Sequence, residues 1–397
     1  MWKYLWEFTL EQREVMMNKV YDVIVIGAGS VGLPAAKSLA DRGLNVAVID
    51  NQASPGQKNA KKAIGGIRAT HSDYGKIKIS HRSIEIFSQM EKEYGYDIGW
   101  MSNGYSFPAY NKKDEKMLKD LMKIQHTFGL NIKWISPEEY NKLVPGINMD
   151  GLLGSTYSPE DGSASPLLAA NAYYFICKEL GVDFYFNETV TGINLKNGEI
   201  TTDNSKYTAN YVINAAGNQA AEIGKMVGLD LPVQPDCHEA AITEPVQRFF
   251  EPMVVDMRPA KGSKNYYFYQ NNEGQVVFCI TPDPPILGTC SENTSVYFPL
   301  VAKRMVKLYP RLANLKIRRS WRGQYPMTPD GFPIVGFPEG MKNYYNLVGM
   351  CGQGFMLGPG LGELTARCIT NSKHDDDDRI LASFYLKRDF SGIEVFK

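Results

Sequence analysis

Three glycines and one acid near the amino end have the types and spacing to bind a dinucleotide. Gly27, Gly29 and Gly32 form the pattern Gly-x-Gly-x-x-Gly, and Asp50 ends the next apolar run. The first glycine permits a tight turn, the second lets a pyrophosphate approach the backbone, and the third lets a helix and a strand pack closely. An acid placed like Asp50 accepts hydrogen bonds from the ribose of a bound adenosine. The pattern alone does not distinguish FAD from NAD.

A strand, a helix and a second strand must hold these residues. Apolar and β-branched residues predict strands over 21–26 and 45–50, and the spacing of apolar residues between them predicts a helix over 33–42. The start of that helix would offer unpaired N–H groups and a partial positive charge to phosphates. A glycine fingerprint also fits an ordinary turn between strand and helix. The complete order of strand, glycine turn, helix, strand and acid is therefore what indicates the dinucleotide site.

The remaining sequence alternates between helical and extended patterns. We expect helices over 74–94, 114–128, 165–180, 293–308 and 361–370, and a helix that begins at a capping box at Ser136. Residues 266–270 and 275–280 predict a hairpin, and 211–217 a buried strand that ends in small residues, where a cofactor could lie close to the backbone. The acidic run 375–378 is interpreted as a solvated connector.

Composition narrows the class of protein. The 397 residues are 44% hydrophobic and 22% charged, with a formal net charge of zero, which is typical of a globular protein large enough for two domains. The zero net charge and the lack of a long basic stretch make nucleic acid an unexpected partner. Six scattered cysteines without a CxxC pair argue against a disulfide scaffold, a metal site or an iron–sulfur cluster. They favour a reducing, cytoplasmic location.

The first residues receive an interpretation of their own. Residues 1–19 contain apolar side chains, but Glu7, Glu11 and Glu14 interrupt them, so they predict neither a signal peptide nor a membrane span. We interpret them as an N-terminal extension. No later stretch is apolar enough to cross a membrane.

Four motifs together resemble a known family. The glycine fingerprint, Asn214-Ala215-Ala216-Gly217, Thr328-Pro329-Asp330-Gly331 and Gly352-Gln353-Gly354-Phe355 occur in the order found in the D-amino-acid oxidase superfamily. Within it the chain looks most like the glycine oxidase and sarcosine oxidase group, and above all like the β subunit of L-proline dehydrogenase and of heteromeric sarcosine oxidase. This resemblance implies FAD rather than NAD.

The resemblance also implies an α/β fold with two discontinuous domains. A Rossmann-like FAD-binding domain of the glutathione-reductase type would comprise residues 20–88, 151–222 and 323–397. A substrate domain with a mixed sheet would comprise residues 89–150 and 223–322 and would cover the flavin.

Contacts with FAD are carried over residue by residue. The fingerprint would hold the pyrophosphate, Asp50 would bind the ribose, and Val190 would contact the adenine. The loop 62–68 would lie beneath the isoalloxazine. The loop 352–356 would lie at the pyrimidine edge of that ring, where the start of the last helix would stabilise negative charge. The expected cofactor contacts are Gly27, Gly29, Ser30, Val31, Gly32, Asp50, Asn51, Gln52, Lys62, Ala63, Gly65, Arg68, Val190, Ala216, Gly217, Gly352, Gln353, Gly354, Phe355 and Met356.

Tyr267 and Tyr325 match tyrosines that face the substrate in the family. Their alternative interpretation is that of packed aromatic residues with satisfied hydroxyls. The chain departs from the family in its cations: none stands at the positions that bind the substrate carboxylate, which leaves Arg68, His71 and Arg322 as candidates. A lone histidine such as His71 is more often structural than functional.

Two further departures concern the flavin. Gly323 stands where monomeric sarcosine oxidases have a cysteine that tethers the flavin, so FAD would be noncovalent. The lysine that activates oxygen in those enzymes falls at Phe278, and the loss of its charge favours a dehydrogenase.

The resemblance therefore implies oxidation of the amine of a small amino acid such as proline, hydroxyproline, sarcosine or glycine. Hydride would pass to flavin N5, and electrons then to a partner acceptor, with Tyr267, Tyr325, Arg68 and His71 in the active site. One alternative is an oxidase that makes hydrogen peroxide. Another is a flavin-carrying subunit of a complex that includes small electron-transfer subunits and has little activity alone.

Overall fold

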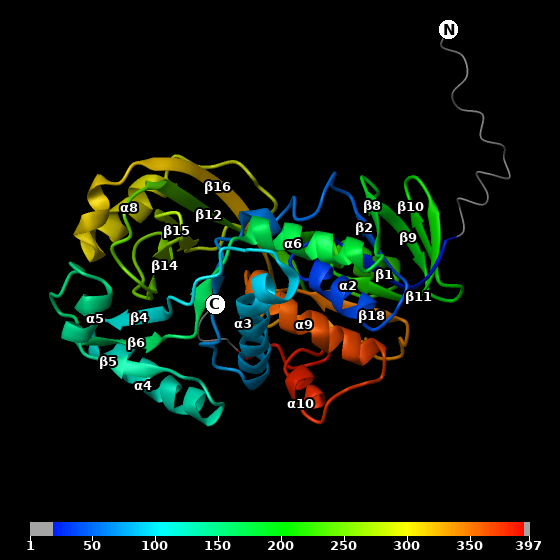
Figure 1. The fold of residues 1–397 in the computed structure, drawn as a ribbon, viewed down its shortest axis with the longest axis horizontal. Coiled ribbons are helices and arrows are strands. Elements are labelled where there is room, and N and C mark those ends of the chain that lie inside the picture. Colours follow the sequence, from blue (N-terminus) through cyan, green and yellow to red (C-terminus); the bar gives the residue numbers. More distant parts are fainter. Residues whose placement is uncertain (1–18, 393–397) are drawn as a thin grey trace, which may run out of the picture.

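Two eight-stranded sheets occupy opposite halves of the molecule (Figure 1). The structure is a computed structural model and describes residues 19–392, so most of the expected N-terminal extension lies outside the described residues. The predicted α/β fold, a Rossmann-like sheet with a second mixed sheet, is confirmed. The residue bounds of the two domains stay a prediction.

The first sheet is built around β1 (Val20–Ile26), which pairs in parallel with β2 (Val46–Asp50) on one side and β11 (Lys206–Asn214) on the other. Its interior residues are fully buried because one face packs against helices and the other against side chains such as Val190, Ile200 and Ile223, and this explains the unbroken apolar run in the sequence. The sheet is completed by β8 (Asp183–Phe186), β9 (Val190–Asn194), β10 (Glu199–Thr202), β17 (Ile334–Gly336) and β18 (Tyr344–Val348).

Four helices pack on the first sheet and on one another: α2 (Gly32–Ala40), α3 (Tyr74–Tyr94), α6 (Pro166–Glu179) and α9 (Gly354–Ile369). The close approach of α9 to α2 depends on glycine. A Cβ at Gly358 would lie 2.0 Å from the Ser30 oxygen, and one at Gly362 would lie 2.6 Å from the Pro34 carbonyl carbon. Helix α9 therefore begins at Gly354, seven residues before the predicted start, because these glycines serve packing rather than a loop.

The second sheet runs in the order β16-β12-β15-β14-β13-β4-β6-β5, with a parallel pair only at β13 and β4. The predicted hairpin is β14 (Ser263–Gln270) and β15 (Gln275–Pro282). The other strands are β4 (Tyr105–Ala109), β5 (Lys133–Ile135), β6 (Gly154–Ser158), β12 (Gln234–Pro245), β13 (Met253–Asp256) and β16 (Ile317–Met327). A separate two-stranded pair joins β3 (Gly66–Ile67) to β7 (Gly162–Ser163).

The two faces of the second sheet have different roles. Tyr266, Phe268 and Phe278 point into a core shared with α5 (Pro137–Leu143) and α8 (Tyr297–Leu308). Because side chains alternate along a strand, Tyr267 and Cys279, which are paired across β14 and β15, point the other way. Tyr267 on that opposite face lines a cavity between the two sheets.

Most predicted helices are present, with two corrections. The capping box at Ser136 begins α5 as expected, and α3 has the predicted bounds. Helix α8 begins at Tyr297 rather than Asn293. The acidic run is not wholly a solvated connector, since Asp377 begins α10 (Asp377–Ala382), is 1% exposed and binds Arg367 at 2.6 Å. The remaining helices are α4 (Lys112–Thr127) and α7 (Ala220–Met226).

Residues 19–392 include no helix that is long and apolar enough to cross a lipid bilayer.

Candidate active site

One long cavity runs from the glycine fingerprint to the face of the second sheet. Its empty volume is about 1600 Å³ when the solvent-filled mouth is included. Segments from both sheets line it: the turn between β1 and α2, the end of β2, residues 56–66, 188–190 and 215–219, β14, β16, and residues 350–356. A cavity of this length suits a dinucleotide with a second small molecule at one end.

The fingerprint turn shows why glycine is needed at each position. Gly27 has φ +112°, and a Cβ there would lie 2.5 Å from the Ala215 carbonyl oxygen. A Cβ at Gly32 would lie 1.9 Å from the Gly27 carbonyl oxygen, so this glycine serves the packing of helix on strand and does not line the cavity. No heavy atom lies within 4 Å of the Cβ position at Gly29, which leaves an open cradle at the start of α2.

Asp50 lines the cavity at the tip of β2. Its Oδ2 accepts a hydrogen bond from the Ala28 N–H at 2.7 Å, and its Oδ1 accepts one from the Gln52 N–H at 2.8 Å. Burial raises the pKa of this carboxyl, and the two N–H donors and the Lys58 charge oppose that rise. A carboxylate has about four acceptor positions, so lone pairs remain for the hydroxyls of a ribose.

The other expected cofactor residues divide into two groups. Those that line the cavity are Ser30, Val31, Asn51, Lys62, Ala63, Gly65, Val190, Ala216, Gly217, Gly352, Gly354, Phe355 and Met356. Gln52, Gln353 and Arg68 lie outside its lining. Lys58 also lines the cavity but was not among the predicted contacts, and its Nζ donates to Gln219 Oε1 at 2.8 Å. The only signal for it was its place in the polar loop after Asp50.

The residues present fit FAD. An open cradle lies at the start of α2, the Asp50 carboxylate lines the cavity at the tip of β2, and the cavity continues to the tyrosines of the second sheet. The individual contacts between these residues and FAD stay predictions.

Tyr267 and Tyr325 come together at the far end of the cavity. Their hydroxyl oxygens are 2.8 Å apart, and both residues belong to its lining. Burial raises both pKa values well above their ordinary value, so both phenols are neutral at physiological pH. Such a pair can donate a hydrogen bond to a ligand without carrying charge.

Two neighbours fix the ring of Tyr325. The His238 ring stacks on it, with centroids 3.9 Å apart, and His238 Nε2 lies 3.2 Å from Asp236 Oδ2. The ring also packs against Gly352, where φ is +79° and a Cβ would lie 2.5 Å from two of its carbons. The tyrosine and the loop at 352 can therefore meet only because residue 352 is glycine.

None of the three candidate cations lines the cavity. The Arg68 guanidinium is buried, donates to the Thr70 carbonyl and lies 3.4 Å from His71 Nδ1. Burial, and then the charges of Arg68 and Lys76, hold the pKa of His71 well below its usual range, so it supplies no positive charge at neutral pH. Arg322 is buried on the face of β16 opposite to Gly323 and Tyr325, and its Nη1 donates to the Glu292 carbonyl at 3.2 Å. Their proposed roles remain untested predictions.

Asp161 lies beside Arg68 in the same buried region. It is 1% exposed, and its Oδ1 accepts a hydrogen bond from the Ala69 N–H at 2.8 Å. Burial raises its pKa to about 7, against the lowering effects of that hydrogen bond and of the Arg68 charge. This carboxyl is therefore only partly ionised at neutral pH.

Phe278, which was matched to the lysine that activates oxygen in monomeric sarcosine oxidases, does not line the cavity. It is buried in the core of the second sheet, where its ring stacks on Tyr297 with centroids 6.3 Å apart. The residue of β15 beside the tyrosine pair is Cys279, which is also uncharged at neutral pH because burial raises its pKa to about 11.

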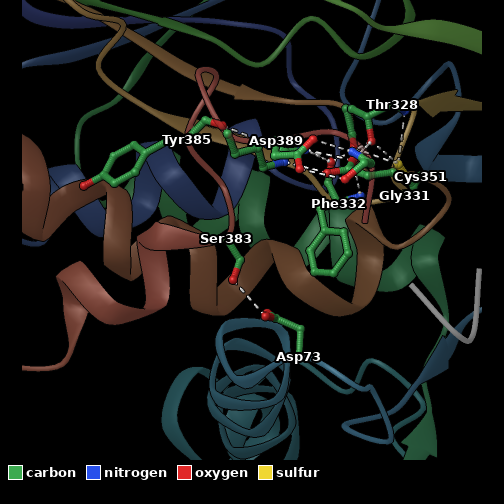
Figure 2. A network of polar contacts seen from close by, with 12 residues as sticks. Asp73, Thr328, Gly331, Phe332, Cys351, Ser383, Tyr385 and Asp389 are labelled. Carbon is green, nitrogen blue, oxygen red and sulfur yellow. Dashed lines mark hydrogen bonds and ion pairs between the residues drawn. The ribbon is translucent and has the colours of Figure 1, made fainter. Parts of the chain in front are cut away.

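The Thr-Pro-Asp-Gly motif positions the loop that carries Gly352 (Figure 2). The Thr328 N–H donates to Cys351 Sγ at 3.3 Å, and the Thr328 hydroxyl donates to the Phe332 carbonyl at 2.7 Å. Asp330 accepts hydrogen bonds from Arg388 at 2.7 and 3.0 Å. The motif thus joins the active-site loop to the segment that follows α10.

Comparison with known proteins identifies the family. The family model "DAO: FAD dependent oxidoreductase" matches residues 22–368. The β subunit of sarcosine oxidase from Arthrobacter sp. is 27% identical over 94% of this chain and 91% of its own length. Mitochondrial dimethylglycine dehydrogenase of Rattus norvegicus is 26% identical over 89% of this chain, which spans only 43% of that longer protein.

Solved structures agree with this result. L-proline dehydrogenase from P. horikoshii superimposes with a TM-score of 0.85 at 31% identity, over 90% of this chain and 96% of the other. Glycine oxidase from Geobacillus kaustophilus has the same fold, with a TM-score of 0.83 at 23% identity over 93% and 99% of the two chains. The chain therefore belongs to the D-amino-acid oxidase family of FAD-dependent oxidoreductases, within its glycine and sarcosine oxidase group.

Proposed function

We propose that the protein oxidises the amine of a small amino acid of the proline, hydroxyproline, sarcosine or glycine type. The observation that carries this proposal is the Tyr267–Tyr325 hydroxyl pair at the end of the cavity that begins at the glycine fingerprint. The relatives and the solved structure named above act on sarcosine, dimethylglycine and proline, which supports the same class of substrate.

The protein's own residues bind and orient the substrate. The neutral phenols would donate a hydrogen bond to the substrate carboxylate, and the second sheet would cover the site and exclude water. FAD, when bound, would supply the two-electron acceptor for the hydride that leaves the carbon next to the amine. The product is an imine that hydrolyses in water. Gly323 lines the cavity where related enzymes have a tethering cysteine, so FAD would be held without a covalent bond.

We further propose that the electrons pass to a partner acceptor rather than to oxygen. Two observations support this: the side chain of β15 beside the tyrosines is an uncharged cysteine, and one relative is named as the β subunit of a larger enzyme. Such a subunit could work in a hetero-oligomer with small electron-transfer chains. That relative is also named an oxidase, so formation of hydrogen peroxide is the second candidate activity.

Anaerobic mixing of the yellow protein with glycine, sarcosine, proline, hydroxyproline and D-amino acids tests the first proposal. One of them should bleach the yellow colour of the oxidised flavin, and a panel that leaves the flavin oxidised contradicts the proposal. Peroxide yield in air, compared with reduction of an artificial dye, then separates an oxidase from a dehydrogenase.

The variant Tyr267→Phe tests the site itself. It should weaken the substrate's apparent affinity about tenfold, because one hydrogen bond to a charged group is lost. Tyr266→Phe is the matched control, since the Tyr266 hydroxyl points into the core and donates to the Arg304 carbonyl at 3.1 Å. Equal behaviour of the two variants would show that Tyr267 does not bind the substrate.

A further inference from the structure

Charge is unevenly distributed along the chain. The sequence has 43 basic residues (Lys and Arg) and 43 acidic residues (Asp and Glu). Residues 51–72 nevertheless contain four basic and no acidic residues, and residues 293–329 contain eight basic and no acidic residues. The rest of the chain therefore holds 31 basic and 43 acidic residues. Such an asymmetry within a neutral chain bears on association with a charged partner rather than on the fold.

These two basic segments meet beside the cavity. The Trp321 indole N–H donates to the Lys62 carbonyl at 2.7 Å, and the Gln324 backbone N–H donates to Asn59 Oδ1 at 3.2 Å. Lys62 and Gly323 both line the cavity, and a Cβ at Gly323 would lie 3.2 Å from the Lys62 Cβ. The fold thus brings the two segments together at the same part of the cavity.

Four exposed cations lie close in sequence to that contact, and we call them the basic rim: Lys58, Lys61, Arg318 and Arg319. Lys58 and Lys61 donate to the amide oxygens of Gln219 and Gln57, at 2.8 and 2.9 Å. The Arg319 guanidinium lies 6.0 Å from the centre of the Trp321 ring. No member of the basic rim forms an ion pair with a carboxylate of residues 19–392, so these charges remain available to a partner.

Under the proposed function, the isoalloxazine lies beside Lys62 and Gly323, and its electrons leave for a partner acceptor. We propose that the basic rim is the docking surface of this acceptor, and that the acceptor is a protein with an acidic face around its redox centre. This inference rests on the proposed function and adds the partner's chemistry and the side from which it approaches. Opposite charges would steer the two proteins together, and salt would screen this effect.

The test uses two acceptor proteins that have the same redox centre and opposite charge. Cytochrome c is basic, and succinylated cytochrome c carries carboxylates on its lysines. The FAD-loaded protein is photoreduced without air or amino acid and then mixed with either acceptor. Each two-electron-reduced flavin returns to the oxidised form as two haem irons pass from Fe(III) to Fe(II), and its protons pass to water. At about 10 mM salt the wild type should reduce the succinylated acceptor about tenfold faster, and at about 200 mM salt the two rates should differ less than about twofold.

Charge reversal locates the effect on the surface. The rim variant, Lys61→Glu with Arg319→Glu, changes two residues that do not line the cavity. The control variant, Lys113→Glu with Lys196→Glu, changes two exposed lysines on α4 and after β9, elements at opposite ends of the molecule (Figure 1). Both variants alter the net charge equally. The rim variant should lose the preference for the succinylated acceptor, and the control variant should keep it.

Equal rates for the two acceptors in the wild type at low salt overturn the inference. A rim variant that keeps the wild-type preference also overturns it; this result is expected if the cations only protect the edge of β16, because glutamate protects an edge strand as well. Duplex DNA that binds the wild type more tightly than succinylated cytochrome c does, at the same salt concentration, overturns the choice of a protein partner. The proposed function fails separately, when no amino acid in the anaerobic panel bleaches the flavin, because photoreduction needs no substrate.

Discussion

Replacement of Gly352 by alanine tests the contact between the loop 350–353 and Tyr325. The new Cβ would lie 2.5 Å from Cδ2 and Cε2 of Tyr325 and 2.9 Å from its Cζ, and the backbone there has φ +79°. A left-handed conformation costs an alanine about 1–2 kcal/mol. The ring cannot stay in place at these distances, so it must leave the His238 stack and the Tyr267 hydroxyl, at a further cost of about 1–2 kcal/mol.

Gly340→Ala is the matched control for the backbone cost. Gly340 has φ +78°, and no heavy atom lies within 4 Å of its Cβ position. The control should therefore lose only about 1–2 kcal/mol of unfolding free energy, whereas Gly352→Ala should lose about 2–4 kcal/mol. Thermal or urea unfolding of the FAD-loaded proteins measures this difference.

The two variants should also differ in the active site. Gly352→Ala should weaken acetate binding about tenfold, because Tyr325 is displaced from its partner, while Gly340→Ala should bind acetate like the wild type. If both variants unfold alike and bind acetate alike, the packing of Tyr325 on Gly352 does not control the site.

Two further predictions concern the cofactor cradle and the buried acid. Gly29→Ala should lose FAD affinity while its apoprotein melts like the wild type, whereas Gly32→Ala, with its Cβ 1.9 Å from the Gly27 oxygen, should lose both FAD and stability; equal apoprotein melting of the two would contradict this. The pKa of Asp161 is about 7 in the folded protein, whereas its ordinary value, which applies to the unfolded chain, is 3.8. The folded protein therefore binds this proton more tightly than the unfolded chain, and the free energy of unfolding falls as pH rises from about 4 to 7. The unfolding free energy of Asp161→Asn should therefore rise relative to that of the wild type across this pH range, by up to about 4 kcal/mol, and then stay constant. Melting temperatures of the two proteins at several pH values measure this, and a difference between them that does not change with pH would refute the assignment.

Local patterns in the sequence were enough to predict the elements that depend on local chemistry. The fingerprint, the capping box at Ser136 and the hairpin 266–280 were each found where the pattern placed them, since turn residues and alternation act over a few positions. The predicted start of α9 was wrong because it depends on contacts between residues far apart in the sequence. Gly358 and Gly362 resemble loop residues until their distant partners, Ser30 before α2 and Pro34 within it, are known.

The candidate site was only partly accessible from the sequence. The meeting of Tyr267 with Tyr325 follows from the resemblance, but which residue of β15 faces them depends on strand register, and a shift of one position exchanges Phe278 for Cys279. In the same way, the burial of Arg322 on the far face of β16 follows from alternation that composition does not reveal. An arginine that is adjacent in sequence to a cavity residue, as Arg322 is to Gly323, therefore need not have its side chain in the cavity.

The order of strands in the first sheet bears on how the protein is made. β1 is completed at residue 26, yet one of its two neighbours is β11 at residues 206–214, and β18 joins β11 only at residues 344–348. The salt bridge from Arg388 to Asp330 comes later still. β1 must therefore keep one edge unpaired until residue 214 has been made, and β11 then keeps one edge unpaired until β18 has been made near the end of the chain. Production at low temperature or with added chaperones should raise the yield of yellow protein.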